Sequence, residues 1–397
     1  MKEDRKTSPL IWIVAGESSG DLYGARLAAD IRKIRPDAAI EGMGGVRMKE
    51  AGVEILVDST ELGVIGLIEV LGSIFKFVRI MFYLLCEAKR RRPDAVVLID
   101  YPGFNIRFAK RLKKAGIPVV WYISPQVWVW RKSNIPKLAR YCTKMMVIFP
   151  FEVDVYQGSG LDVEFVGHPL VEIVRERRDP SLHRDPKRVL LLPGSRRSET
   201  KRLLFPMLET VAILKQRHPD LKFEIATPRE KVRADVENDM REFIMKHPDA
   251  VLPEIRVLCG KTAECLQTCT AGLAASGTGT VECAIAGLPL VVAYRLNPVT
   301  FLLARLIIRR LFRNAFTMPN IILNRKVFEE FLQFQVVPED LAEAMERILP
   351  GGERRAQADA DMEEMVREIE GGVRGAGRNA ALAVLQVADY ARGRENV

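Results

Sequence analysis

The sequence predicts an α/β protein made of two tandem Rossmann-like, doubly wound domains that face a cleft. Short apolar runs rich in β-branched residues alternate with helical periodicity, which is typical of buried parallel strands joined by crossover helices. The chain has 397 residues, more than one hydrophobic core usually supports. The alternation stops within residues 166–188, where three prolines and many charges indicate an interdomain linker.

Eight apolar runs are predicted strands. They are residues 10–16 (LIWIVAG), 94–100 (DAVVLID), 118–124 (PVVWYIS), 144–149 (KMMVIF), 189–194 (VLLLPG), 222–226 (KFEIA), 271–276 (AGLAAS) and 288–294 (LPLVVAY). Helices are expected from Asp21, over 106–115, over 199–217 and from about Thr278. We expect a first domain over residues 1–172 and a second over 187–370, with ligands at the carboxyl ends of the strands.

Charge and cysteine content restrict the class of protein. The formal net charge of +9, from 60 Lys and Arg against 51 Asp and Glu, favours an anionic partner. Six cysteines form neither a C-x-x-C motif nor zinc-finger spacing, so we expect reduced thiols, a cytosolic protein and no metal site. The apolar run before Gly16 is too short for a secretory signal, and charges interrupt residues 62–86, so no transmembrane helix is expected.

Residues 16–20 (GESSG) follow the first predicted strand and match the nucleophile elbow of hydrolases around Ser18. That chemistry needs an acid and then a histidine later in the chain. Three of the four histidines lie in charged or proline-adjacent, surface-like stretches, which leaves only His168. A phosphate-binding turn before a helix capped by Asp21 or Ser19 is an alternative. A tight strand-to-helix turn without a ligand explains the same residues.

Two turns of the second half are candidates for a nucleotide diphosphate. Residues 191–199 (LLPGSRRSE) place Ser195 and Arg196 after a strand, where an arginine can neutralise charge on a departing phosphate. Residues 274–282 (AASGTGTVE) lead into a helix, where backbone N–H groups can bind phosphate and Glu282 can accept ribose hydroxyls. A solvated basic loop and a glycine turn that only permits tight packing are the alternatives.

The first half offers a candidate base and a candidate pocket. Asp100 ends a predicted strand, a position suited to a general base, although helix capping is the ordinary role of such an aspartate. Residues 121–131 (WYISPQVWVWR) carry three of the four tryptophans, which can line a sugar or acyl pocket but more often pack in a core.

Two segments, residues 76–92 and 301–315, mix basic and apolar side chains. This is the composition of helices that lie on an anionic membrane surface. Buried helices with one solvated stripe have the same composition.

Ten stretches together resemble the lipid-A-disaccharide synthase family. They are GESSGD (16–21), GMGG (42–45), VIGLIEVL (64–71), IDYPGFN (99–105), YISPQVWVWR (122–131), FPFE (149–152), GHPL (167–170), LLPGSRRSE (191–199), ASGTGTVE (275–282) and MPN (318–320). The resemblance spans nearly the whole chain and implies the GT-B glycosyltransferase fold. It also implies that the C-terminal helix, residues 371–397, packs back on the first domain.

The resemblance implies an inverting glycosyl transfer at the cytoplasmic face of the inner membrane of Gram-negative bacteria. UDP-2,3-diacylglucosamine and 2,3-diacylglucosamine 1-phosphate (lipid X) would give the β(1→6) disaccharide 1-phosphate and UDP. No cofactor, metal or nucleic acid is implied. Some family members exchange their last helices between subunits, so a homodimer is possible. Another UDP-sugar enzyme of this fold, such as an epimerase, and a non-catalytic nucleotide-binding or membrane-surface protein are the alternatives.

Site residues follow from the same resemblance. Asp100 and Arg196 fall on the family's essential aspartate and arginine. The donor would be held by Ser195, Ser276, Gly277, Thr278, Gly279, Thr280, Glu282, Asn320, Arg325, Glu330 and Gln333. The cleft and acceptor side would comprise Gly16, Glu17, Ser18, Gly20, Asp21, Glu69, Asn105, Ser124, Trp128 and His168. On this interpretation the nucleophile is the acceptor hydroxyl, and Ser18 is a candidate ligand contact.

One segment departs from the family pattern PN-x-x-AGRE-x-x-PE-x-x-Q. Residues 319–333 (PNIILNRKVFEEFLQ) retain Arg325, Glu330 and Gln333. They carry Leu323 and Asn324 for Ala-Gly, Lys326 for Glu and Glu329 for Pro. The reversed charge at Lys326 alters how this segment would meet the diphosphate or a partner subunit.

Overall fold

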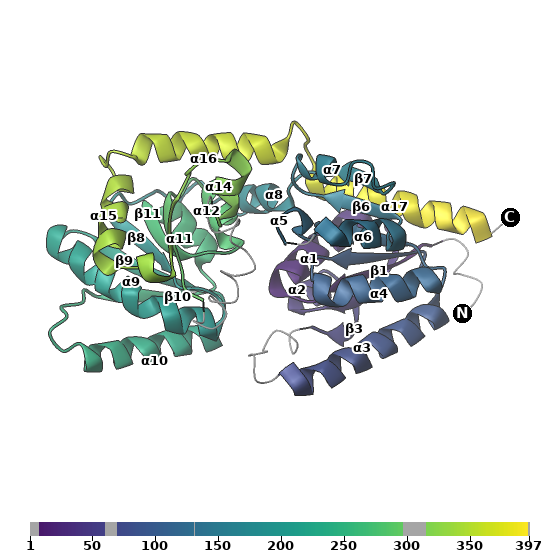
Figure 1. Cartoon of the computed structure of the whole chain (residues 1–397), viewed down its shortest axis with the longest axis horizontal. Coiled ribbons are helices and arrows are strands. Elements are labelled where there is room, and N and C mark those ends of the chain that lie inside the picture. The colour runs from purple at the N-terminus through teal and green to yellow at the C-terminus, as the bar shows by residue number, and fades with distance from the viewer. Residues whose placement is uncertain (1–7, 60–69, 131, 297–314, 396–397) are drawn as a thin grey trace. The chain divides into compact units, whose positions relative to one another are not determined.

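The computed structural model describes residues 8–59, 70–130, 132–296 and 315–395. The chain divides into two compact units, Met1–Pro169 with Ile369–Val397 (unit 1) and Leu170–Glu368 (unit 2). Each unit has one sheet in which every neighbouring pair of strands is parallel, with helices on its two faces (Figure 1). The predicted fold class, two α/β domains with parallel sheets, is therefore confirmed.

Unit 1 contains a seven-stranded sheet in the order β3-β2-β1-β4-β5-β6-β7. Its strands are β1 (Leu10–Ala15), β2 (Ala39–Gly44), β3 (Glu54–Asp58), β4 (Ala95–Ile99), β5 (Val119–Tyr122), β6 (Lys144–Val147) and β7 (Asp162–Phe165). Its helices are α1 (Ser18–Ile34), α2 (Val46–Glu50), α3 (Val70–Arg91), α4 (Pro102–Lys114), α5 (Val127–Trp130), α6 (Ile135–Tyr141), α7 (Glu152–Val155) and α17 (Ala376–Glu395).

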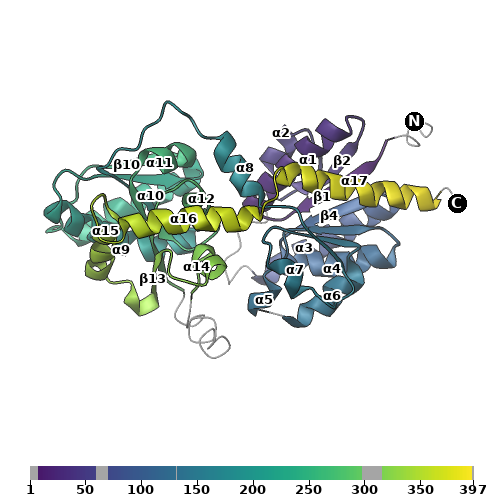
Figure 2. The same cartoon turned by 90° about the horizontal axis from the view of Figure 1, so that it is seen from above.

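The central strands of unit 1 are covered on both faces because their side chains are apolar in both directions. On one face Trp12, Val14 and Leu98 pack with Phe108 and Leu112 of α4. On the other face α1 and α17 lie side by side and contact the sheet (Figure 2). Burial on two faces explains why β1 and β4 appear in the sequence as continuous apolar runs.

Unit 2 contains a six-stranded sheet in the order β10-β9-β8-β11-β12-β13. Its strands are β8 (Arg188–Leu192), β9 (Lys222–Thr227), β10 (Ile255–Cys259), β11 (Ala271–Ala275), β12 (Leu290–Tyr294) and β13 (Glu329–Leu332). Its helices are α8 (Pro169–Glu176), α9 (Arg197–Arg217), α10 (Glu230–Lys246), α11 (Thr262–Thr268), α12 (Gly279–Ile285), α14 (Met318–Leu323), α15 (Pro338–Ile348) and α16 (Arg355–Glu370).

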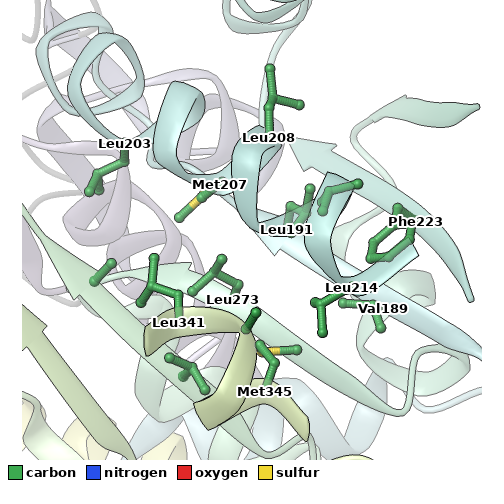
Figure 3. Close-up of a cluster of buried hydrophobic side chains, with 14 of the residues drawn as sticks. Val189, Leu191, Leu203, Met207, Leu208, Leu214, Phe223, Leu273, Leu341 and Met345 are labelled. Carbon is green, nitrogen blue, oxygen red and sulfur yellow. The ribbon is translucent and has the colours of Figure 1, made fainter. Parts of the chain in front are cut away.

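The core of unit 2 lies between its sheet and helices α9 and α15. Leu203, Met207 and Leu214 recur on one face of α9 and pack over Leu191 and Phe223 of the sheet (Figure 3). Replacing one such buried leucine by alanine typically costs about 2–5 kcal/mol, so this cluster holds the helix firmly on the sheet.

Five strands were not predicted, namely β2, β3, β7, β10 and β13. Four of them, all except β2, are the edge strands of the two sheets. Edge strands face solvent along one side and tolerate charges, such as Glu54, Asp162 and Arg256, which interrupt the apolar run that a buried strand requires.

The segment expected to be a linker is partly helical. Pro169–Glu176 form α8, in which Leu170, Val171 and Ile173 are buried. At the other end of the chain, α17 belongs to unit 1 and packs along α1 (Figure 2). Within the described ranges, no helix is long and apolar enough to cross a membrane.

Candidate active site

In unit 1 the strand order reverses between β1 and β4. The GESSG turn and the turn that carries Asp100 both start there. Ala15 at the end of β1 pairs with Ile99 at the end of β4. Residues 16–21 and Asp100 therefore begin at neighbouring positions on the carboxyl edge of the sheet. Open parallel sheets bind their ligands outside such a reversal of strand order.

Asp100 lies in an unusual turn directly after β4. Asp100 and Tyr101 have φ angles of 44° and 48°, in the left-handed region that non-glycine residues rarely adopt. Burial, and secondarily the Glu17 carboxylate, raises the pKa of Asp100 to about 6, while a hydrogen bond from the Tyr101 backbone opposes the shift. A carboxylate with this pKa is ionised at neutral pH and is more basic than an ordinary aspartate, as a general base requires.

The GESSG turn packs against this aspartate turn. A Cβ atom on Gly16 would lie 2.3 Å from Cδ1 of Tyr101, so only glycine fits there. A Cβ atom on Gly20 would lie 3.2 Å from the Ala15 side chain, a tight contact that the neighbouring residue would have to relieve by a small shift. Glu17 and Ser18 are exposed at the start of α1 and remain accessible to a ligand.

Asp21 holds a neighbouring helix. Its carboxylate accepts hydrogen bonds from the backbone N–H groups of Gly45 (2.6 Å), Arg47 (3.0 Å) and Met48 (3.1 Å). These groups start α2, so Asp21 supplies the acceptor that a helix N-terminus needs. Its carboxylate is thus engaged within the fold, and a contact with the acceptor sugar stays a prediction.

Asn105 lies in the first turn of α4 and is fully buried. Its Nδ2 donates to the carbonyl oxygens of Ile99 (3.2 Å) and Asp100 (2.8 Å). In this structure the Asn105 side chain has no exposed surface to offer to an acceptor sugar, so a direct contact with that sugar stays a prediction.

Three polar side chains in the segments that follow β5 and β6 are buried, namely Ser124, Glu152 and Tyr156. The hydroxyls of Ser124 and Tyr156 lie 2.7 Å apart. The Glu152 carboxylate accepts hydrogen bonds from the N–H groups of Ile148 (3.3 Å) and Phe149 (3.2 Å). Burial raises the pKa of Glu152 to about 7, although these backbone donors oppose the shift. No role for Glu152 or Tyr156 was derived from sequence, although FPFE stands among the motifs of the resemblance.

Aromatic side chains of the same segments pack against one another. Trp128 lies edge-on to Phe151, with 5.1 Å between ring centroids, and Phe149 is 5.2 Å from His168. Burial lowers the pKa of His168 to about 3, so its imidazole is neutral at physiological pH. Trp121 belongs to the core, so the core interpretation holds for that tryptophan.

In unit 2 the loops after β8 and β11 begin at neighbouring positions, because Leu192 pairs with Ala274. Ser195 and Arg196 follow β8, and both side chains are exposed at the start of α9. Arg196 Nη1 lies 3.4 Å from Glu199 Oε1. An exposed guanidinium beside a helix N-terminus is able to meet a diphosphate.

The glycine-rich turn after β11 is open to solvent. Apart from adjacent residues of the chain, no atom of the described residues lies within 4 Å of a Cβ atom placed on Gly277 or Gly279. Gly277, Thr278 and Gly279 are exposed at the start of α12, and Ser276 is half-buried. Thr280 is buried and its Oγ1 donates to the Gly277 carbonyl (2.8 Å), so it shapes the turn. Glu282 lies one turn into α12, 3.8 Å from Arg177.

Asn320 and Glu330, both expected to bind the donor, bind their own segment in this structure. Asn320 Oδ1 accepts from the N–H groups of Val327 (2.9 Å) and Phe328 (2.8 Å), and its Nδ2 donates to the Phe328 carbonyl (2.8 Å). Glu330 accepts from the backbone and hydroxyl of Thr317, and burial raises its pKa. Donor binding by these two residues stays a prediction.

Arg325 and Gln333 are likewise engaged within unit 2. Arg325 pairs with Asp361 (2.8 Å) and Glu364 (2.6 Å) of α16. Gln333 Oε1 accepts from the Leu296 N–H (3.0 Å), and its Nε2 donates to the Leu296 carbonyl (3.2 Å). Arg325 and Gln333 thus bind partners distant in sequence, which a linear motif does not reveal.

Some predictions lie outside the described part of the chain. They concern Glu69, nearly all of residues 301–315 and the side chain of Trp130. Among the residues that are described, no group of three or more His, Cys, Asp and Glu side chains is arranged to hold a metal ion.

Two Rossmann-like parallel sheets with candidate sites at their strand ends are the architecture of a GT-B glycosyltransferase. The chain belongs to the lipid-A-disaccharide synthetase family, which residues 11–384 match. It is 37% identical to the lipid-A-disaccharide synthase of Trichlorobacter lovleyi over 96% of this chain and 97% of that relative. The Myxococcus xanthus lipid-A-disaccharide synthase is 36% identical over 96% and 97% of the two chains. The protein is therefore an enzyme, a glycosyltransferase of lipid A biosynthesis.

Solved structures support the fold at low sequence identity. The UDP-GlcNAc 2-epimerase of Neisseria meningitidis, bound to UDP-GlcNAc, superposes with a TM-score of 0.60 at 11% identity, covering 96% of this chain and all of that chain. MurG of Acinetobacter baumannii gives a TM-score of 0.52 at 15% identity, covering 95% and 99% of the chains. At such identities the likeness concerns the fold alone.

Proposed function

We propose that the chain joins UDP-2,3-diacylglucosamine to 2,3-diacylglucosamine 1-phosphate and releases UDP and the β(1→6) disaccharide 1-phosphate. Family membership supports the reaction type. The observation that carries the residue assignment is Asp100, with its raised pKa at the reversal of strand order in unit 1. The acceptor is accordingly assigned to the strand ends of unit 1 and the donor nucleotide to those of unit 2.

In the proposed reaction the 6-hydroxyl oxygen of the acceptor attacks C1 of the donor sugar. The new C1–O bond forms as the bond from C1 to the UDP oxygen breaks, with inversion at C1. Asp100 accepts the hydroxyl proton, directly or through a water. A base of pKa about 6 combines a high ionised fraction at neutral pH with useful proton affinity.

The departing UDP gains negative charge that must be stabilised. Arg196 presents an exposed guanidinium, and the turn of Ser276 and Gly277 presents backbone donors near the start of α12. Cationic and N–H groups aimed at a developing phosphate charge are the usual means of lowering such a barrier. Ser195 and Glu282 are proposed to contact the diphosphate and the ribose. We propose no cofactor.

Helix α3 is proposed to lie on the inner membrane surface. Phe75, Val78 and Phe82 are 79%, 46% and 55% exposed and recur at helical spacing, so they share one face. Lys76 and Arg79 are also exposed. Apolar and cationic side chains on one exposed helix match an anionic lipid surface.

We propose that the enzyme is cytoplasmic and peripheral on the inner face of the inner membrane. A homodimer is a further prediction, and light scattering of the purified protein distinguishes it from a monomer.

The decisive experiment incubates the purified protein with both acylated sugars and seeks the disaccharide phosphate by mass spectrometry. Asp100→Asn should lower turnover by about 10²–10⁴-fold, because a general base contributes that much, and should leave UDP affinity nearly unchanged. Asp154→Asn, at an exposed aspartate of α7, is the matched control. Absence of product beside an active synthase would refute the reaction. Loss of UDP binding together with turnover would refute the role as base.

A further inference from the structure

Asn105 binds the backbone of three consecutive residues around Asp100. Its Nδ2 donates to the carbonyls of Ile99 (3.2 Å) and Asp100 (2.8 Å). Its own backbone N–H donates to the Tyr101 carbonyl at 3.0 Å. One residue thus binds the carbonyl oxygens of all three residues of the turn that carries the aspartate.

The turn needs such support because its conformation is unfavourable. Asp100 and Tyr101 are both left-handed, and the left-handed region costs roughly 1–2 kcal/mol for each non-glycine residue. The carbonyl of Asp100 belongs to the peptide between these two residues. Holding that carbonyl fixes the rotation of the peptide and with it the direction in which the Asp100 side chain leaves the backbone.

The oxygen of the Asn105 amide indicates that asparagine is not the most stabilising residue for this position. Its Oδ1 is buried, and no donor among the described residues reaches it. A buried acceptor without a donor costs roughly 1–3 kcal/mol. A leucine of similar shape would avoid that cost, but it would supply no donor to the turn.

We propose that Asn105 is a positioning residue which, through the carbonyls of Ile99 and Asp100, holds the Asp100 carboxylate in the orientation needed to accept the acceptor proton. The inference rests on the proposed role of Asp100 as base. Asn105 itself touches no substrate, since its side chain is fully buried.

The test compares Asn105→Ala and Asn105→Leu with Asn379→Ala. Asn379 also donates its Nδ2 to two carbonyls, those of Val166 (3.3 Å) and Arg374 (3.1 Å), in unit 1. We expect kcat to fall about 10²-fold in both Asn105 variants, the loss associated with a misplacement near 1 Å, with the donor KM changed less than about 3-fold. Asn379→Ala should keep wild-type kcat.

The pH profile separates positioning from folding. In the wild type, kcat should rise through an ionisation near pH 6, the pKa of Asp100 beside Glu17 and Tyr101. When the turn relaxes, Asp100 becomes more solvated, so the rise should move toward the ordinary aspartate pKa of about 3.9. Loss of folded protein alone lowers the amplitude and leaves the midpoint in place.

Three results overturn the inference. The first is an unchanged kcat per folded enzyme in either Asn105 variant, and the second is a reduced kcat with an unmoved midpoint. If Asn105→Ala does not fold, the shape-matched Asn105→Leu alone decides. The third is an active Asp100→Asn variant, which refutes the role of Asp100 as base. An inactive Asp100→Asn variant beside a fully active Asn105 variant refutes only the positioning role of Asn105.

Discussion

The ring of Tyr101 lies against the backbone of Gly16, and these two residues join the turns after β4 and β1. A Cβ atom on Gly16 would approach Cδ1 of Tyr101 to 2.3 Å, a distance that side chains do not tolerate. Tyr101 also stacks on Phe104 and lies 6.2 Å from Phe77 of α3, measured between ring centroids. The ring is therefore unable to retreat without moving the turn that carries Asp100.

Gly16→Ala should destabilise unit 1 by about 1–3 kcal/mol, the usual range for overpacking. It should also lower kcat, because the added methyl group pushes Tyr101 and so displaces Asp100. Chemical denaturation and steady-state kinetics measure the two effects. Gly103→Ala is the control, since apart from adjacent residues of the chain no atom of the described residues lies within 4 Å of its Cβ position. In a Tyr101→Ala background the same Gly16→Ala change should cost much less, and an undiminished cost there would contradict the steric explanation.

Asp21→Ala should destabilise the protein by about 2–3 kcal/mol, because three N–H groups at the start of α2 lose a charged acceptor. Thermal unfolding of this variant is compared with that of Asp37→Ala, at an exposed aspartate. A wild-type melting temperature with a raised acceptor KM would instead indicate a ligand contact.

Glu152→Gln should alter the dependence of stability on pH. The folded pKa near 7 exceeds the unfolded value near 4.5, so wild-type stability falls as pH rises from 4.5 through 7. Glutamine keeps an acceptor for Ile148 and Phe149 but does not ionise. The variant should therefore gain about 1–3 kcal/mol relative to the wild type between pH 5 and pH 8.

Denaturant unfolding at pH 5 and pH 8 measures the gain of Glu152→Gln. Glu343→Gln, at an exposed glutamate, should leave the pH dependence unchanged. An identical slope for Glu152→Gln and the wild type would show that Glu152 does not titrate in this range.

Asn320→Ala should cost about 2–3 kcal/mol, because the N–H groups of Val327 and Phe328 would lose a buried acceptor. Asn238→Ala, at an exposed position on α10, should be neutral. Equilibrium unfolding and the donor KM are measured together. A KM raised more than tenfold without loss of stability would favour direct donor binding.

Phe75→Ser combined with Phe82→Ser should weaken binding to anionic vesicles, because the two rings are the most exposed large apolar groups of the described part of α3. Sedimentation with phosphatidylglycerol vesicles measures the loss. Met245→Ser removes an exposed apolar side chain from unit 2 and serves as control. Equal loss in the control, or none in the double variant, would contradict membrane docking through α3.

The sequence was informative wherever a structural property depends on residues that are adjacent in the chain. The runs at β1 and β4 are apolar because both faces of those strands are buried, so they are visible without a structure. Asp100 and the Ser276–Gly277 turn were identified because short motifs follow predicted strands. The edge strands β3 and β10 were missed because one side faces solvent and accepts charge.

By itself the sequence determined the fold class, the family and the position of Asp100 at a strand end. The tertiary structure alone decided that Tyr101 closes on Gly16, that Asp21 caps α2 and that Asn105 holds the Asp100 turn. It also showed that the Asn320 side chain accepts hydrogen bonds from the backbone of Val327 and Phe328. The physical reason is that strand character arises from local side-chain patterns, whereas burial, hydrogen-bond partners and pKa depend on residues that only folding brings together.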